Sequence, residues 1–171
     1  MKAAVFGSSF VSRLGRSSEA DCRIKYFGVG GMTAEEPNKA CLESLLRYAP
    51  DRVLIHLGAN DISIHKTPRE VADDILRLVS HLDDKGVGTV LVGQILTRGG
   101  TFKKSPGMTG DMFQRKKNRV NTILRGKLGK RFILLRMKFP QDFAADEVHI
   151  SEGNLWKYGA QIRRALLKEL H

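Results

Sequence analysis

The stretch VLIHLGAND, residues 53–61, decides the fold, because an apolar run and a turn meet inside it. The run ends at Leu57 and Gly58 follows, and a short apolar run bounded by a turn signal is typical of a strand that is covered on both faces. Similar runs occupy residues 3–6, 24–27, 89–92 and 132–135. The sequence therefore predicts five strands.

Longer amphipathic segments separate these runs. The clearest predicted helix covers residues 68–85, with Thr67 as N-cap, Pro68 in the first turn and apolar residues at helical spacing. Further helices are expected at residues 39–48, 110–126 and from about 151 to the C-terminus, the last with Leu170 on its apolar face. Alternating strands and helices predict an α/β fold whose parallel sheet has helices on both faces.

Composition predicts one domain over residues 1–171, because 42% hydrophobic residues in a chain of this length suffice for one sizeable core. Cys22 and Cys41 have no CxxC or Cys/His cluster near them, so neither a disulfide framework nor a zinc site is indicated. The chain shows neither a signal-peptide h-region nor a membrane span, which makes an intracellular protein the default expectation. A mature secreted chain or an excised domain would look the same, and the oligomeric state is left open.

Three motifs directly follow the first three predicted strands. These are GSSF at residues 7–10, GVGG at residues 28–31 and GAND at residues 58–61. The carboxyl ends of parallel strands meet at one edge of a sheet, where ligands bind, so we expect the three motifs to lie close together. A fourth motif, DEVH at residues 146–149, lies between the last strand and the last helix.

Together these motifs hold the parts of a serine acyl-transfer site. Ser9 follows a strand and precedes a helix, where free backbone amides favour a nucleophile, although it could also be an ordinary N-cap. Asp146 and His149 are spaced so that the carboxylate can hold the imidazole, although a surface Asp and a helix-flanking His remain the alternative. Gly31 and Asn60 can donate to a substrate oxygen, or can serve only as turn residues.

The four motifs, in this order, resemble the SGNH (GDSL-type) hydrolase superfamily over residues 3–170. The resemblance implies Ser9 as nucleophile, His149 as general base and Asp146 as its orienting partner. It also implies an oxyanion hole formed by Gly31 and Asn60 together with the Ser9 amide. The implied fold is a three-layer α/β/α sandwich, flavodoxin-like, with a five-stranded parallel sheet. Ser8 departs from the family pattern, in which an Asp is common at this position.

The function expected on this basis is hydrolysis of a small or lipid-like acyl ester through an acyl-enzyme intermediate, without a metal or cofactor. The alternative is a module of the same fold with little or no turnover that binds nucleic acid or an anionic membrane. Two other prominent side chains, His56 and Trp156, are expected to be packing residues rather than ligands.

The net charge of +11 comes from one segment, residues 98–138, which holds 13 Lys/Arg and one Asp/Glu. This segment predicts a polyanion-binding surface, although a solvated basic helix face is the simpler interpretation. The candidate binding residues are Lys103, Lys104, Arg115, Lys116, Lys117 and Arg119. The long loop at residues 96–110 is interpreted as a mobile segment and a possible lid. Esterase domains of LINE-type retroelement proteins show a looser similarity and accompany nucleic-acid-binding segments.

Overall fold

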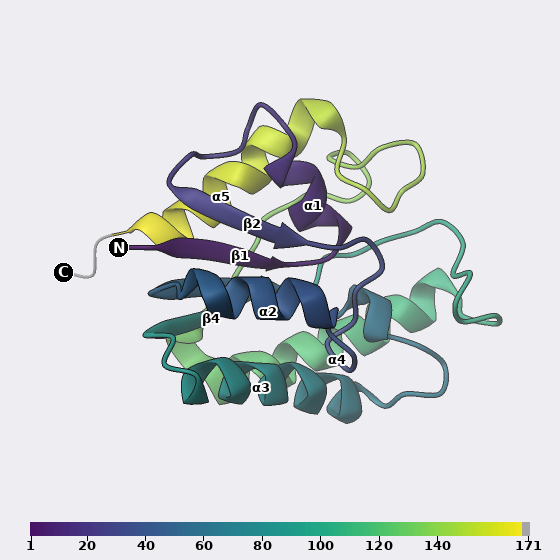
Figure 1. Ribbon diagram of the computed structural model, residues 1–171. Coiled ribbons are helices and arrows are strands. Elements are labelled where there is room, and N and C mark those ends of the chain that lie inside the picture. The colour runs from purple at the N-terminus through teal and green to yellow at the C-terminus, as the bar shows by residue number, and fades with distance from the viewer. Residues whose placement is uncertain (169–171) are drawn as a thin grey trace.

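A five-stranded parallel sheet forms the centre of the computed structural model, which describes residues 1–168. The strands lie in the order β2-β1-β3-β4-β5 and every neighbouring pair is parallel, as Figure 1 shows for β1 and β2. Their bounds are β1 Ala3–Gly7, β2 Ile24–Gly28, β3 Arg52–His56, β4 Thr89–Gly93 and β5 Phe132–Ile133. The predicted five-stranded parallel sheet is therefore confirmed.

Strand β5 ends earlier than the apolar run at residues 132–135 predicts. The Gln94 backbone N–H donates to the Ile133 carbonyl, but the next partner in the ladder is a side chain, because Leu135 N–H donates to Gln94 Oε1. Leu134 is 46% exposed. The ladder thus stops at Ile133, where a glutamine side chain replaces the backbone of β4.

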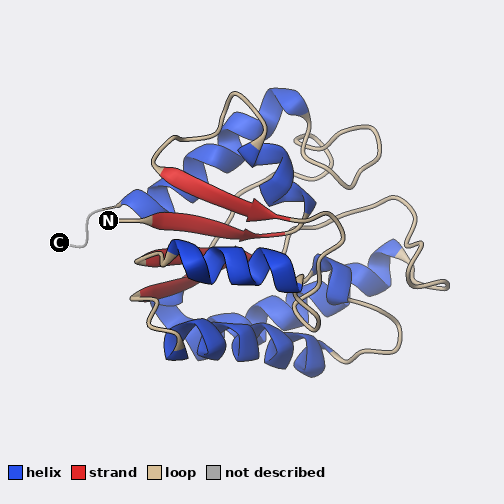
Figure 2. Cartoon of the chain, in the orientation of Figure 1, coloured by secondary structure: helices blue, strands red, loops and turns tan. Residues whose placement is uncertain are grey.

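Helices cover both faces of the sheet, which gives the three-layer α/β/α arrangement (Figures 1 and 2). Helices α1 and α5 lie on one face, and α2, α3 and α4 lie on the other. Their bounds are α1 Ser9–Gly15, α2 Lys39–Tyr48, α3 Pro68–Asp84, α4 Gly110–Leu128 and α5 Leu155–Leu167. Single 3₁₀ turns occur at η1 Ala59–Asp61, η2 Gly129–Arg131 and η3 Glu152–Asn154.

The helix boundaries follow local capping. Thr67 Oγ1 accepts a hydrogen bond from Glu70 N–H, and Glu70 Oε1 accepts one from Thr67 N–H, which closes a capping box at the start of α3. The last helix begins later than residue 151, because η3 precedes α5. Leu170, which was placed on its apolar face, lies outside the described residues.

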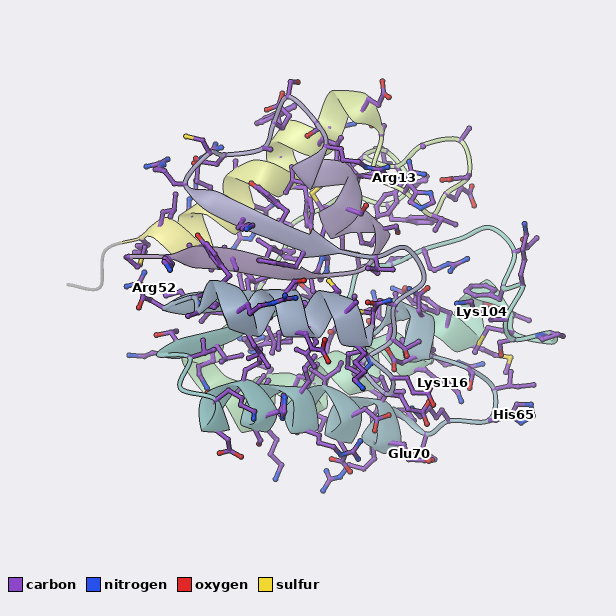
Figure 3. The ribbon with its side chains drawn as sticks, viewed as in Figure 1. Arg13, Arg52, His65, Glu70, Lys104 and Lys116 are labelled. Atoms are coloured by element: carbon purple, nitrogen blue, oxygen red, sulfur yellow. The ribbon has the colours of Figure 1, made fainter. Side chains whose placement is uncertain are left out.

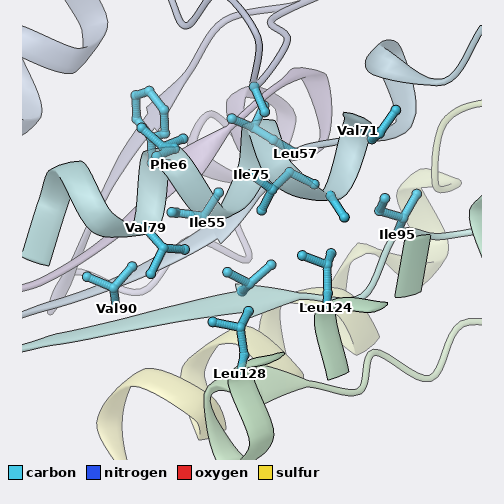
Figure 4. Close-up of a cluster of buried hydrophobic side chains, with 14 of the residues drawn as sticks. Phe6, Ile55, Leu57, Val71, Ile75, Val79, Val90, Ile95, Leu124 and Leu128 are labelled. Carbon is cyan, nitrogen blue, oxygen red and sulfur yellow. The ribbon is translucent and has the colours of Figure 1, made fainter. Parts of the chain in front are cut away.

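Two apolar clusters form the core, one on each face of the sheet, because alternate strand residues point to opposite faces. Val5 and Leu54 pack with α1 and α5, whereas Phe6 and Ile55 pack with α2, α3 and α4. Figure 4 shows the second cluster, in which side chains of the sheet meet those of α3 and α4. No helix within residues 1–168 combines the length and the apolar character that a membrane crossing requires.

The strand order creates a crevice at the carboxyl end of the sheet. Strand β1 has β2 on one side and β3 on the other, so the chain order reverses between β1 and β3. Loops that leave two such strands diverge, and ligands bind at this switch point. Ser9 follows β1 and Asn60 follows β3, so the two residues flank the crevice.

Candidate active site

Asp146 and His149 form a direct pair. His149 Nδ1 lies 2.6 Å from Asp146 Oδ2. The other carboxylate oxygen, Oδ1, accepts hydrogen bonds from the backbone N–H groups of Val148 and His149, at 2.9 and 3.0 Å. The backbone and side-chain hydrogen bonds from His149, followed by that from Val148, lower the pKa of Asp146 below its usual range. Asp146 therefore stays a carboxylate at neutral pH and acts only as an acceptor.

A tight turn presents this pair. Ala144 N–H donates to the His149 carbonyl at 2.7 Å, and Glu147 N–H donates to the Ala144 carbonyl at 2.9 Å. Glu147 has a φ of 57°, in the left-handed region that few side chains adopt. The turn thus folds residues 144–149 back on themselves and fixes the direction of the imidazole.

Ser9 is the first residue of α1 and directly follows the buried Ser8. A side chain at Gly28 would collide with the backbone of Ser12, so this glycine lets α1 approach the end of β2. The ring of Phe10 lies edge-on to the His149 ring, with 6.5 Å between the centroids. The first turn of α1 is therefore next to His149. Within residues 1–168, however, no hydrogen bond joins Ser9 Oγ to His149.

The two candidate oxyanion donors are on neighbouring loops. Gly31 has a φ of 76°, which favours glycine. Asn60 lies in η1, and its Nδ2 donates to the Met32 carbonyl at 3.2 Å. A side-chain amide carries two N–H donors, so the second remains for a substrate oxygen.

Asp61 connects these loops, a role that the turn preference of Asp only partly indicated. Its buried carboxylate accepts hydrogen bonds from the backbone N–H groups of Ala34 and Glu35, at 3.0 to 3.1 Å. Burial raises the pKa of Asp61, and the backbone hydrogen bonds oppose that effect. The GAND loop is thereby attached to the chain that follows GVGG.

A hollow of about 400 Å³ brings several of the predicted residues together. Asn60, Asp146 and His149 line the hollow together with the loop between β4 and α4. The lining residues from that loop are Arg98, Thr101, Phe102, Lys103, Lys104 and Ser105. Ser9 and Gly31 are not among the lining residues, although Lys104 Nζ donates to the Gly31 carbonyl at 3.4 Å.

The loop between β4 and α4 contacts the other motif loops as well. Gly99 N–H donates to the Glu147 carbonyl at 2.9 Å, next to the Asp146–His149 pair. Ser105 Oγ accepts a hydrogen bond from Ile64 N–H at 3.1 Å. These long-range contacts have no signature in the sequence beyond the length of the loop. The loop lines the hollow, which is the position that a lid requires. That the loop moves to open and close the hollow stays a prediction.

His56 is a packing residue, as predicted. It is buried, Nε2 lies 3.0 Å from the Gln94 carbonyl, and Nδ1 lies 2.6 Å from the Tyr158 hydroxyl. Burial lowers the pKa of His56 to about 4, and the hydrogen bond to Gln94 opposes that effect. Trp156 was expected to pack as well, and this prediction was wrong, because the side chain is 54% exposed.

One of the six candidate polyanion-binding residues is not on the surface. The side chain of Lys117 is buried and Nζ donates to Thr97 Oγ1 at 2.6 Å, so placing Lys117 on an exposed basic face was wrong. Lys116 Nζ donates to the carbonyls of Ser63 and Lys66, at 2.7 and 2.8 Å. Arg115 and Arg119 remain exposed on α4.

Lys103 and Lys104, by contrast, lie at the hollow rather than on the helix. Figure 3 shows the Lys104 and Lys116 side chains at the end of the molecule where the strands have their carboxyl ends. Binding of a polyanion by these residues stays a prediction.

The comparisons with known proteins agree with this fold. A GDSL-like lipase from Bacteroides thetaiotaomicron has a TM-score of 0.72 at 14% identity, over 99% of this chain and 89% of that one. Est24, a carbohydrate acetylesterase from Sinorhizobium meliloti, also has a TM-score of 0.72, at 19% identity, over 95% of this chain and 96% of that one. At these identities the likeness shows the fold alone.

A search of the curated proteins found no match, and the similarity to retroelement domains stays a prediction. The model of the GDSL-like lipase/acylhydrolase family matches residues 3–154, which include all four motifs. The chain therefore belongs to the GDSL-like lipase/acylhydrolase family.

Proposed function

We propose that the protein is a serine esterase in which Ser9, His149 and Asp146 act in sequence. The observation that carries the proposal is the 2.6 Å contact between His149 Nδ1 and Asp146 Oδ2, at the hollow that Asn60 also lines. A carboxylate only accepts, so Nδ1 carries the proton and Nε2 is left free as a base.

The reaction follows from these roles. His149 Nε2 takes the proton of Ser9 Oγ while that oxygen attacks the ester carbonyl carbon. The negative oxygen of the tetrahedral intermediate is stabilised by the N–H groups of Ser9 and Gly31 and by Asn60 Nδ2. The intermediate collapses, and His149 passes the proton to the leaving alkoxide. A water molecule then repeats the attack on the acyl-enzyme, which releases the acid and restores Ser9.

A small acyl ester is the substrate class that the hollow supports best. Its volume of about 400 Å³ is in the lower part of the range for small-molecule sites. We include acetylated carbohydrates among the candidate esters, because Est24, which shares this fold, is named a carbohydrate acetylesterase. Short acyl chains should therefore be hydrolysed better than long ones.

An ester series from acetyl to long-chain tests the proposal. Ser9→Ala should abolish turnover, whereas Ser12→Ala, one turn further along α1, should retain it. Both variants should fold, because the N-cap of α1 is Ser8 and alanine has a higher helix propensity than serine inside a helix. Retained turnover in a folded Ser9→Ala protein would contradict the assignment of the nucleophile.

A further inference from the structure

The hollow beside His149 is lined by three cations. Arg98, Lys103 and Lys104 all come from the loop between β4 and α4. Asp146 is the one carboxylate among the lining residues, and its oxygens already accept hydrogen bonds from His149 and from two backbone amides. Among residues 1–168, the lining of the hollow therefore holds three cations and a single carboxylate, which is already hydrogen-bonded.

These cations differ from other basic residues of the protein. Within residues 1–168, none of the three forms an ion pair with a carboxylate. Lys66, by comparison, pairs with Glu35 and Asp74, and Lys157 pairs with Asp142. Three cations and one carboxylate line this concave site, and this excess of positive charge favours an anion there, because a hollow whose charges are mostly of one sign concentrates ligands of the opposite sign.

The position of Arg98 adds geometry to this charge. Its guanidinium stacks on the Phe102 ring at 4.7 Å, and Nη2 donates to the Thr101 carbonyl at 2.9 Å. An arginine held in this way has lost part of its conformational freedom before a ligand arrives, so less entropy is lost on binding. Lys104 comes from the same loop, and its Nζ donates to the Gly31 carbonyl, 3.4 Å away.

We propose that the ester hydrolysed in this hollow carries an anionic group, a carboxylate or a phosphate, which binds between Arg98, Lys103 and Lys104. The proposal rests on the proposed esterase function and narrows its substrate class. The anionic group can belong to the acyl part or to the alcohol part of the ester, and the experiment below separates these two sources.

Two matched substrate pairs test the charge preference at low salt. For the alcohol side, 4-acetoxybenzoate is compared with the neutral 4-acetoxybenzamide. For the acyl side, mono-4-nitrophenyl adipate is compared with 4-nitrophenyl hexanoate. We expect kcat/KM of the anionic member to exceed that of the neutral member by about 10-fold or more in at least one pair, since hydrogen bonds to charged groups are the strong ones. The advantage should shrink as salt rises.

The double variant Lys103→Gln/Lys104→Gln removes two of the cations and leaves the stacked Arg98 in place. Its anionic-to-neutral ratio of kcat/KM should fall by about 10-fold. The control Lys85→Gln/Lys127→Gln removes the same net charge from exposed positions elsewhere and should keep the ratio within about twofold. Because each ratio is taken within one variant, a general loss of turnover does not affect it.

Equal rates within both pairs, or an unchanged ratio in Lys103→Gln/Lys104→Gln, would overturn the inference while the proposed esterase function stands. If the wild type hydrolyses none of these esters, the proposed function fails and binding decides the inference. Calorimetry then compares the unreactive amides 4-acetamidobenzoate and 4-acetamidobenzamide. Tighter binding of the anion that disappears in the lysine double variant supports the anionic site, and equal affinities overturn it.

Discussion

Two histidines lie against the same aromatic ring and have opposite surroundings. The centroids of His56 and His149 are 5.6 and 6.5 Å from that of Phe10. His56 is buried and both of its ring nitrogens have partners inside the protein. His149 lines the hollow and has one nitrogen on Asp146. A histidine with both nitrogens occupied holds the fold together, whereas one with a single nitrogen occupied at a ligand site is available as a base.

The strongest test of this comparison removes the proposed base. His149→Ala should lower kcat/KM for ester hydrolysis by roughly 10⁴-fold or more, because the members of a triad work as a unit. Asp146→Asn should cost less, since the imidazole remains. Steady-state kinetics with circular dichroism as the folding control measure both effects. A folded His149→Ala protein with near-normal turnover would remove His149 from the mechanism.

Asn60→Ala tests whether Asn60 donates to the oxyanion. If Asn60 Nδ2 donates to the oxyanion, kcat should fall by roughly 10²-fold or more and KM should change little, because this hydrogen bond strengthens in the transition state. Initial rates over a range of substrate concentrations separate the two constants. An effect on KM alone would make Asn60 a residue that binds the ground state.

His56→Phe tests whether His56 stabilises the fold rather than taking part in catalysis. The variant keeps an aromatic ring beside Phe10 but leaves the Gln94 carbonyl and the Tyr158 hydroxyl without their partner. The free energy of unfolding at pH 7 should fall by about 2–4 kcal/mol. Denaturant titration measures this change, and activity per folded molecule should fall far less than in His149→Ala. A stable His56→Phe protein without activity would assign His56 to the catalytic machinery.

The pH dependence of stability provides a second readout for His56. Its pKa is about 4 in the folded state and 6.5 when unperturbed, so the unfolded chain binds the proton more readily. The neutral, buried His56 therefore contributes fully to the free energy of unfolding above pH 6.5. That contribution, roughly 3 kcal/mol, is lost as pH falls from 6.5 towards 4. In His56→Phe the slope over that interval should flatten, and an unchanged slope would contradict a buried neutral imidazole.

The smallest expected effect concerns the exposed arginines of α4. If they bind a polyanion, log Kobs for duplex DNA should fall less steeply with log salt concentration in Arg115→Gln/Arg119→Gln than in the wild type. The slope should be smaller by about 2, because each phosphate that an arginine neutralises contributes roughly 0.9. Arg13→Gln/Arg47→Gln, which are exposed outside the basic segment, serve as the control. RNA and anionic vesicles are tested in parallel, and absence of binding to all three at low salt would leave these arginines as a solvated surface.

Much of the fold could be predicted because strands covered on both faces require continuous apolar runs, as at residues 53–57. The Asp146–His149 pair could be predicted from a local spacing of three residues. The hydrogen bond of Gly99 with Glu147 could not, because residues 48 positions apart in the chain leave no periodic signal.

The burial of Lys117 did have a signal in the sequence. It lies four residues after Phe113 and three before Val120, on the apolar face of its own helix. Counting positive charges alone placed Lys117 with the exposed basic residues, because a count takes no account of helical spacing. Charge composition therefore locates a basic segment, and only the helical spacing shows which of its residues face solvent.

Labelling with a fluorophosphonate probe, followed by peptide mapping, identifies the serine that the histidine activates. We expect one adduct, on Ser9, that disappears in His149→Ala and is retained in His56→Phe. A label on another residue, or equal labelling in His149→Ala and the wild type, would contradict the assignment of Ser9 as nucleophile and His149 as its base.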